Sequence, residues 1–199
     1  MKTTDTRTQI LDAAQDLIQR VGVNAMSYQD ISNVVGIRKA SIHYYFPTKD
    51  DLLATLLSRY NDYFLRLADS IIAVPEQADI KLRRYLALFE ATLDSSSCDK
   101  ACLYGMIGAE LATLKNSQVE QVQAFYRDNQ ERLAKILSQG RDSGAFRFAG
   151  DVNVMAILIF SLLEGAMLIV RTEGGITQYR AILDQLMQLI KGLELTPNV

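Results

Sequence analysis

The stretch YQDISNVVGIRKASIHYYFPTKDDL, residues 28–52, decides the fold. Ser27 stands directly before it in the position of a helix N-cap, and Asp30 three residues later makes the pair a variant of the capping box. A short helix is expected to follow, and Gly36 supplies the positive backbone angle that a tight turn between two helices needs. The residues of this helix expected to face inward are Ile31, Val34 and Val35.

A third short helix is expected over Lys39 to Tyr45. It stops before Pro47, because the residue that precedes a proline is pushed out of helical geometry. Ile42 and Phe46 are expected to face the domain core. A longer helix, from about Asp5 to Val21, carries an apolar stripe and comes first in the chain. Two short helices joined by a glycine turn are the outline of a helix-turn-helix.

Residues 28–52 resemble the DNA-binding domain of the TetR family almost position for position, and the resemblance extends from about Arg7 to Leu57. It implies a homodimeric repressor, usually one that releases its operator when a ligand enters a divergent C-terminal domain. The chain is therefore expected to divide into a helix-turn-helix DNA-binding domain at residues 1–47 and a ligand-binding and dimerisation domain at residues 48–199.

The third helix has the properties of a recognition helix, which is short, carries polar side chains and keeps an apolar back face. Its small residues permit close approach to DNA, and its basic residues can reach guanine edges or phosphates. Ser27 can offer its hydroxyl to a phosphate, and Lys49 can hold another. The residues expected to contact DNA are Ser27, Tyr28, Arg38, Lys39, Ala40, Ser41, His43, Tyr44, Tyr45 and Lys49.

The formal net charge is −2, which argues against nonspecific nucleic-acid binding by the whole surface. The positive charge is local, because residues 31–48 include Arg38 and Lys39 but no Asp or Glu, and Lys49 follows. Two cysteines are too few for a disulfide framework, and the polar N-terminus has no secretory signal. A cytoplasmic location is therefore expected.

Apolar residues continue at helical spacing after Pro47, with no alternation typical of strands, so the protein is expected to be all-α. Thr48 is expected to cap a long fourth helix that ends near Pro75. Further helices are expected at about Asp79 to Leu93, Lys100 to Leu114, Ser117 to Gly140, Gly150 to Arg171 and Ile176 to Leu193. They would form a C-terminal helical bundle for ligand binding and dimerisation.

The most apolar stretch, residues 152–170, raises the question of a membrane span. It carries Asn153 and Glu164 and lacks flanking Lys, Arg, Trp or Tyr clusters, which favours a helix buried in protein on nearly every side. A monomer of this size rarely buries a helix so completely, so a subunit interface is expected. The candidate interface residues are Leu158, Leu162, Met167, Leu183, Leu186, Met187 and Ile190.

A ligand cavity inside the bundle would be lined from the fourth to the eighth helix. The candidate liners are Phe64, Phe89, Cys102, Met106, Phe125, Tyr126 and Arg171. The segment around Cys102 resembles that of the N-ethylmaleimide-responsive repressor of the TetR family, which implies a cysteine that senses electrophiles or oxidants. Arg171 would replace the lysine that partners this cysteine. The alternative is a small buried cysteine that serves only in packing.

Two other functional classes need to be considered. A helical enzyme is not favoured, because no nucleophile stands beside a histidine and the one histidine, His43, lies inside the DNA-binding motif. An architectural DNA-binding protein without a ligand stays open. No metal or cofactor is expected. The expected partners are double-stranded operator DNA, a small-molecule effector and a second copy of the chain, with no membrane.

Overall fold

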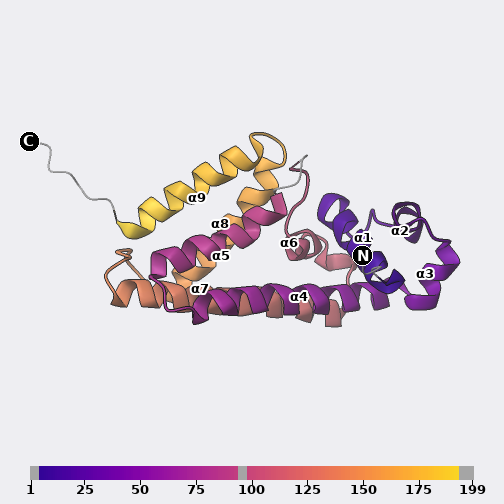
Figure 1. The fold of residues 1–199 in the computed structure, drawn as a ribbon, viewed down its shortest axis with the longest axis horizontal. Helices are drawn as coiled ribbons and strands as arrows, with labels where there is room; N and C mark the ends of the chain where they lie inside the picture. The colour runs from indigo at the N-terminus through magenta and orange to yellow at the C-terminus, as the bar shows by residue number, and fades with distance from the viewer. Residues whose placement is uncertain (1–4, 94–97, 193–199) are drawn as a thin grey trace, which may run out of the picture. The chain divides into compact units, whose positions relative to one another are not determined.

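The computed structural model describes residues 5–93 and 98–192, and its regular elements are all helices (Figure 1). This confirms the predicted all-α class. The elements are α1 (Thr6–Val21), α2 (Tyr28–Val35), α3 (Lys39–Tyr45), α4 (Lys49–Ala73), α5 (Ala78–Leu93), α6 (Leu103–Gly108), the 3₁₀ helix η1 (Leu111–Thr113), α7 (Asn116–Asp142), α8 (Val152–Val170) and α9 (Gly175–Lys191).

The chain forms two compact units, and each contains two separate stretches of sequence. Unit 1 comprises residues 1–63 and 100–125, and unit 2 comprises residues 64–99 and 126–199. The helix-turn-helix therefore shares a unit with α6, which comes from the C-terminal part of the chain. The division at residue 47 remains a prediction about function, because compactness alone does not define a functional domain.

The ends of the first helices follow the capping pattern that the sequence predicts. Asp5 caps α1 by accepting from the Thr8 amide at 3.1 Å. Ser27 and Asp30 form a reciprocal capping box at the start of α2, and Gly36 ends α2 in the left-handed conformation with a φ of 75°. The capping box and the turn at Gly36 confirm the prediction for α2, and the Asp5 cap is an addition to it.

Unit 1 has a core of its own beneath α2 and α3. Ile31, Ile42 and Phe46 are at most 2% exposed, and they pack with the apolar face of α1. Val34 is 64% exposed, so the prediction that it faces inward is wrong. The buried residues of α2 are Tyr28, Ile31 and Ser32, all in its first five residues, so the core contact of this short helix lies in its N-terminal half and Val34 falls beyond it.

The predicted helix from Lys100 to Leu114 is wrong in its extent. The structure has only α6 and η1 there, and residues 100–102 run without helical structure. Ala101 instead pairs with Gln19 of α1: its amide donates to the Gln19 carbonyl at 3.0 Å, and its carbonyl accepts from the Gln19 side chain at 3.2 Å. Because the N–H and carbonyl of Ala101 already bond to α1, they are not available for the i→i−4 hydrogen bonds of a helix.

Unit 2 contains α5, α8 and α9, which pack against one another (Figure 1). Two buried polar residues of this unit, Asn129 and Lys81, are hydrogen-bonded. Asn129 accepts from the Tyr85 hydroxyl at 2.8 Å, and the Lys81 ammonium donates to the Ile72 carbonyl at 2.8 Å and to Gln139 at 3.0 Å. Such bonds offset the desolvation cost of buried polar groups and fix the register between helices.

Helix α8 was expected to be buried on nearly every side, and within one chain this is wrong. One face packs in unit 2, and the opposite face is an exposed apolar stripe. By length and composition alone α8 could cross a membrane, but only 33% of its apolar window is buried inside the chain. The exposed stripe consists of Val154, Ile157, Leu158, Leu168 and Ile169.

The predicted interface residues divide between this stripe and the interior. Leu158 is 59% exposed and Leu162 is half-buried. Five others are between 0% and 8% exposed inside the protomer, because they lie where α5, α8 and α9 pack against one another. These five, which are buried inside the protomer, are Met167, Leu183, Leu186, Met187 and Ile190.

Candidate nucleic-acid interface

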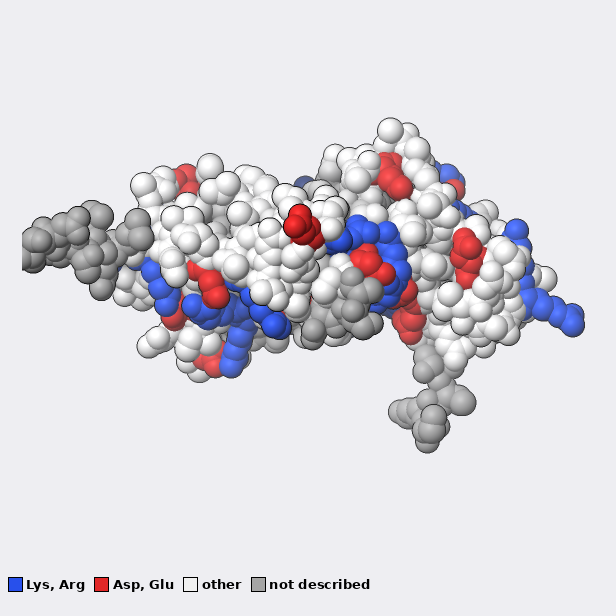
Figure 2. Space-filling model, turned by 90° about the horizontal axis from the view of Figure 1, so that it is seen from above, with Lys and Arg blue, Asp and Glu red and all other residues white. Residues whose placement is uncertain are grey.

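Helix α3 presents one polar face to solvent and one apolar face to the core. Ile42 lies on the core side and is fully buried, while Ser41 is half-buried between the two faces. Blue basic atoms project from the surface in the region of α2 and α3 in Figure 2. The exposed residues on this side are Arg38, Lys39, Ala40, His43, Tyr44 and Tyr45.

The side chains of Arg38 and Lys39 have no hydrogen-bond or ion-pair partner among the described residues. Elsewhere in unit 1 the basic side chains are engaged: Arg59 pairs with Asp12 at 2.8 Å, and Lys115 pairs with Asp50 at 2.6 Å. The two charges on α3 therefore remain available for an external anion, as the predicted DNA contacts require.

The other polar residues of α3 have defined geometries. The Nδ1 atom of His43 lies 3.2 Å from the Pro47 carbonyl, so in the neutral ring Nδ1 carries the hydrogen and Nε2 is an acceptor. Tyr44 is 83% exposed, and its ring meets that of Tyr45 edge to face at 5.2 Å between centroids. Tyr45 is less exposed than Tyr44, at 38%.

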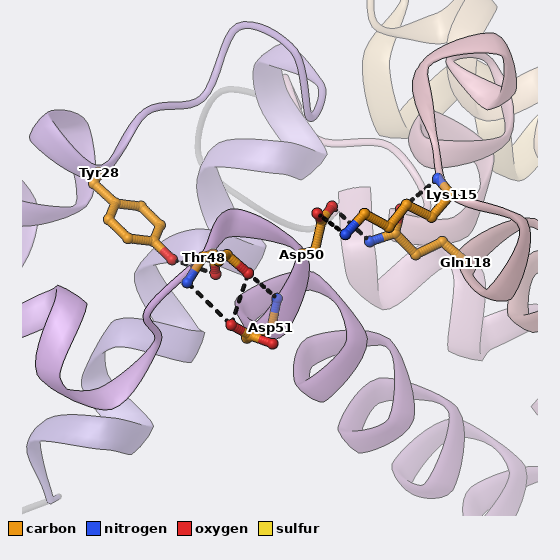
Figure 3. A network of polar contacts seen from close by, with 6 residues as sticks. All are labelled: Tyr28, Thr48, Asp50, Asp51, Lys115 and Gln118. Atoms are coloured by element: carbon orange, nitrogen blue, oxygen red, sulfur yellow. Dashed lines mark hydrogen bonds and ion pairs between the residues drawn. The ribbon is translucent and has the colours of Figure 1, made fainter.

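Tyr28 is buried, although the sequence places it among the expected DNA contacts. Its hydroxyl lies 2.9 Å from the Phe46 carbonyl and 2.6 Å from the Thr48 carbonyl (Figure 3). Burial, together with the nearby carboxylates of Asp51 and Asp50, raises the pKa of Tyr28 to about 12. The hydroxyl therefore holds the turn between α3 and α4 and has no hydrogen left for a phosphate.

Ser27 is exposed, but its polar groups are engaged by Asp30. The Ser27 hydroxyl lies 2.6 Å and its amide nitrogen 2.9 Å from the same carboxylate oxygen. The hydrogen bond from Ser27 is the first cause of the lowered pKa of the Asp30 carboxyl. A phosphate at this point would meet a carboxylate, so the predicted Ser27 contact remains a prediction without support from the geometry.

Lys49 is half-buried and reaches inward to the loop between α1 and α2. Its ammonium donates to the Met26 carbonyl at 2.6 Å and to the Val23 carbonyl. Burial lowers the pKa of Lys49, while Glu110 and Asp30 act in the opposite direction. Two of its three N–H groups are thus engaged inside the protein, and one is left for the predicted phosphate contact.

The sequence gives no signal for Glu110, which completes this loop. One oxygen of its carboxylate accepts from the Val23 amide at 2.8 Å and from the Asn24 amide at 3.0 Å. Glu110 lies 87 residues from Val23 in the chain, and no local spacing relates the two. Only the packing of α6 against α1 brings them together.

The first turns of α4 and α7 are joined by a polar network (Figure 3). Asp50 accepts from Lys115 at 2.6 Å and from the Gln118 amide at 3.2 Å. The bond from Lys115 is the first cause of the lowered pKa of Asp50. Thr48 and Asp51 form a capping box at the start of α4, which confirms the predicted cap.

The predicted ligand-binding residues lie in both units. Cys102, Met106 and Phe125 belong to unit 1, where the Phe125 ring stacks on that of Tyr104 at 3.9 Å. In unit 2 the rings of Phe64 and Phe89 lie 5.2 Å apart and Tyr126 lies 5.5 Å from Phe160. Arg171 is half-buried in unit 2. Each aromatic candidate therefore packs against another aromatic ring of its own unit.

Cys102 is 2% exposed at the start of α6, whereas Cys98 is half-buried. Across residues 5–93 and 98–192, no group of three His, Cys, Asp or Glu side chains is arranged to hold a metal ion.

Comparison with known proteins places this geometry in a family. Residues 10–56 match the bacterial regulatory proteins of the tetR family, and residues 80–186 match the tetracyclin repressor-like C-terminal domain. A TetR-family regulator from Agrobacterium tumefaciens is 30% identical, with a TM-score of 0.86 over 94% of this chain and 97% of that one. A TetR regulator from Legionella pneumophila is 30% identical, with a TM-score of 0.84 over 96% and 100%.

More distant proteins share the same architecture. The transcriptional repressor DhaR of Mycobacterium sp. strain GP1 is 22% identical over 194 residues, which are 96% of this chain and 92% of that protein. The reduced form of NemR from E. coli is 20% identical, with a TM-score of 0.78 over 98% and 100% of the two chains, and shows the fold alone. This chain belongs to the TetR family of DNA-binding transcriptional regulators, and it is not an enzyme.

We predict that Tyr28→Phe lowers the free energy of unfolding at pH 8 by about 1–3 kcal/mol, because it leaves the buried Phe46 carbonyl without the Tyr28 donor. Since the folded pKa of Tyr28 is raised to about 12, its contribution is complete below pH 10 and is lost as the pH rises through about 12. Urea unfolding at several pH values measures both effects.

The matched control is Tyr63→Phe, because Tyr63 is 58% exposed on α4. It should behave as wild type throughout. If Tyr28→Phe were as stable as Tyr63→Phe at pH 8, the role of the hydroxyl in the turn would be wrong.

Proposed function

We propose that this chain is a homodimeric repressor that reads operator DNA with α3 and is released by a small-molecule effector acting on its C-terminal part. The observation that carries the proposal is the pair Arg38 and Lys39, exposed and without partners among the described residues, on a helix whose opposite face is buried. DhaR and KstR2, which are named as transcriptional repressors, support repression.

The chemistry of α3 suggests how the helix would read DNA. Arg38 and Lys39 would donate to guanine N7 and O6 or to phosphates, which are acceptors. The Nε2 atom of neutral His43 is an acceptor, so it would favour the amino groups of adenine or cytosine over a phosphate. The exposed hydroxyls of Tyr44 and Tyr45 would donate to the backbone.

We predict that Lys39→Ala weakens binding about tenfold or more, and reduces the slope of log K against log salt by about 0.9 if Lys39 neutralises one phosphate. Fluorescence anisotropy would be measured on a duplex selected from a random library with the wild-type protein. Lys135→Ala is the matched control, because Lys135 is an exposed lysine on α7. An unchanged affinity and slope in Lys39→Ala would remove this residue from the interface.

Dimerisation is proposed through the exposed stripe of α8. Val154, Leu158 and Ile169 are each at least 59% exposed, and with Ile157 and Leu168 they recur at intervals of three, four and eleven residues. Exposed apolar area of this kind marks an interaction surface in a protein of this class. A second copy of α8 would cover the stripe symmetrically, and we favour this occupant over a membrane.

We predict that Leu158→Asp converts the dimer to monomers and abolishes operator binding, because it places an unpaired carboxylate in an apolar interface. Sedimentation velocity measures the change of mass. Ile80→Asp, on α5 and at a residue 40% exposed outside the stripe, should remain dimeric. A dimeric Leu158→Asp protein would exclude this face.

The effector is proposed to bind reversibly. A sensor cysteine must be reachable as a thiolate, and burial of Cys102 at 2% exposure favours its packing role. We predict that N-ethylmaleimide labels half-buried Cys98 before Cys102, as followed by mass spectrometry. Operator binding should respond to the reagent equally in wild type and Cys102→Ser. Loss of binding in the wild type alone would instead establish Cys102 as an electrophile sensor.

A further inference from the structure

The loop between α1 and α2 is held by two side chains of opposite charge. The Val23 amide donates to the Glu110 carboxylate at 2.8 Å, and the Val23 carbonyl accepts from the Lys49 ammonium. Glu110 also accepts from the Asn24 amide, and Lys49 also donates to the Met26 carbonyl. Four backbone groups between Val23 and Met26, in a loop that leads into the helix-turn-helix, thus depend on two charged side chains.

Gly22 allows the carboxylate to approach this loop. A Cβ atom at Gly22 would lie 2.4 Å from Oε1 and 3.1 Å from Cδ of Glu110, far inside van der Waals contact. The φ of Gly22 is 87°, which also favours glycine. The position therefore combines a backbone requirement with a requirement for empty space beside Glu110.

Glu110 reaches the loop from residues 100–113, which we call the strap. The strap contacts α1 at two further points and the loop between α1 and α2 at one. Lys100 pairs with Asp16 at 2.5 Å, and Ala101 exchanges two hydrogen bonds with Gln19. At the far end, the Thr113 hydroxyl accepts from the Asn24 side chain at 3.1 Å. All these residues belong to unit 1.

We infer that Glu110 is a positioning residue for DNA recognition, through which the strap fixes the start of the helix-turn-helix. The loop continues from Met26 into Ser27, the N-cap of α2, and α2 packs on α3. Without the carboxylate, the buried Val23 loses the acceptor of its amide, and the loop is free to move. A displacement of α6 that withdraws Glu110 would thereby disorder α2 and α3, which we call the reading head.

This inference rests on the proposed role of α3 in reading DNA. The first test compares Glu110→Ala with Glu110→Gln and with Glu131→Ala, an exposed glutamate on α7. The probe is the duplex selected with the wild-type protein. We expect Glu110→Ala to bind about tenfold more weakly, Glu110→Gln to recover part of the loss through its carbonyl oxygen, and Glu131→Ala to match wild type.

Gly22→Ala tests the same contact from the other side, because its methyl group displaces the carboxylate. Gly144→Ala is the control for backbone strain alone, since Gly144 has a φ of 76° and open space around it. Operator binding should fall in Gly22→Ala and stay at the wild-type level in Gly144→Ala. In the double variant with Glu110→Ala, the effect of Gly22→Ala on binding should shrink, because the two remove one contact.

Hydrogen exchange separates positioning from general destabilisation. The amides of Val23 and Asn24 should exchange at least tenfold faster in Glu110→Ala, while amides in the core of unit 2 keep their protection. Wild-type affinity in Glu110→Ala, or unchanged exchange at both amides, would overturn the inference. If the wild-type protein selected no duplex, the proposed function would be wrong instead. Lys39→Ala distinguishes loss of a DNA contact from loss of loop positioning, because it should weaken binding without changing hydrogen exchange at Val23.

Discussion

The backbone of Val23 is the point on which the reading head depends, because its N–H and its carbonyl are both engaged by charged side chains from outside the first three helices. Glu110 comes from the segment after α6, and Lys49 opens α4. A hydrogen bond with one charged partner is stronger than a neutral one. The loop that starts the helix-turn-helix is thus tied to Glu110, which lies in the part of the chain that matches the C-terminal domain.

The short helices α2 and α3 need contacts with the rest of the protein to stay folded. Helices α2 and α3 have eight and seven residues, and isolated helices of that length are not stable in water. Their order comes from the buried side chains of Ile31, Ile42 and Phe46 and from the Tyr28 hydroxyl on the following turn. Because the inner face supplies the stability, the outer face of α3 can leave Arg38 and Lys39 without protein partners.

Much of the fold could be predicted from local sequence signals. The capping box of α2, the Thr48 cap of α4, Gly36 and the boundary of α3 before Pro47 are confirmed, since each depends on residues a few positions apart. The long predicted helix at Lys100 to Leu114 is wrong because Ala101 pairs with Gln19, a contact across 82 residues. The role of Glu110 and the inward direction of Lys49 could not be predicted either, because both depend on contacts between residues far apart in the chain. Which residues of α8 are exposed depends on the helices that pack against it, and the spacing of apolar residues does not identify those helices.

The central claim is that α3 contacts DNA while the strap holds the loop between α1 and α2 in place. Hydrogen exchange of the full-length protein, with and without the selected duplex, tests both parts in one experiment. The account predicts that DNA slows exchange in α2 and α3, and that the amides of Val23 and Asn24 are already protected in the free protein. Protection by DNA confined to unit 2, or rapid exchange at Val23 and Asn24 without DNA, would contradict it.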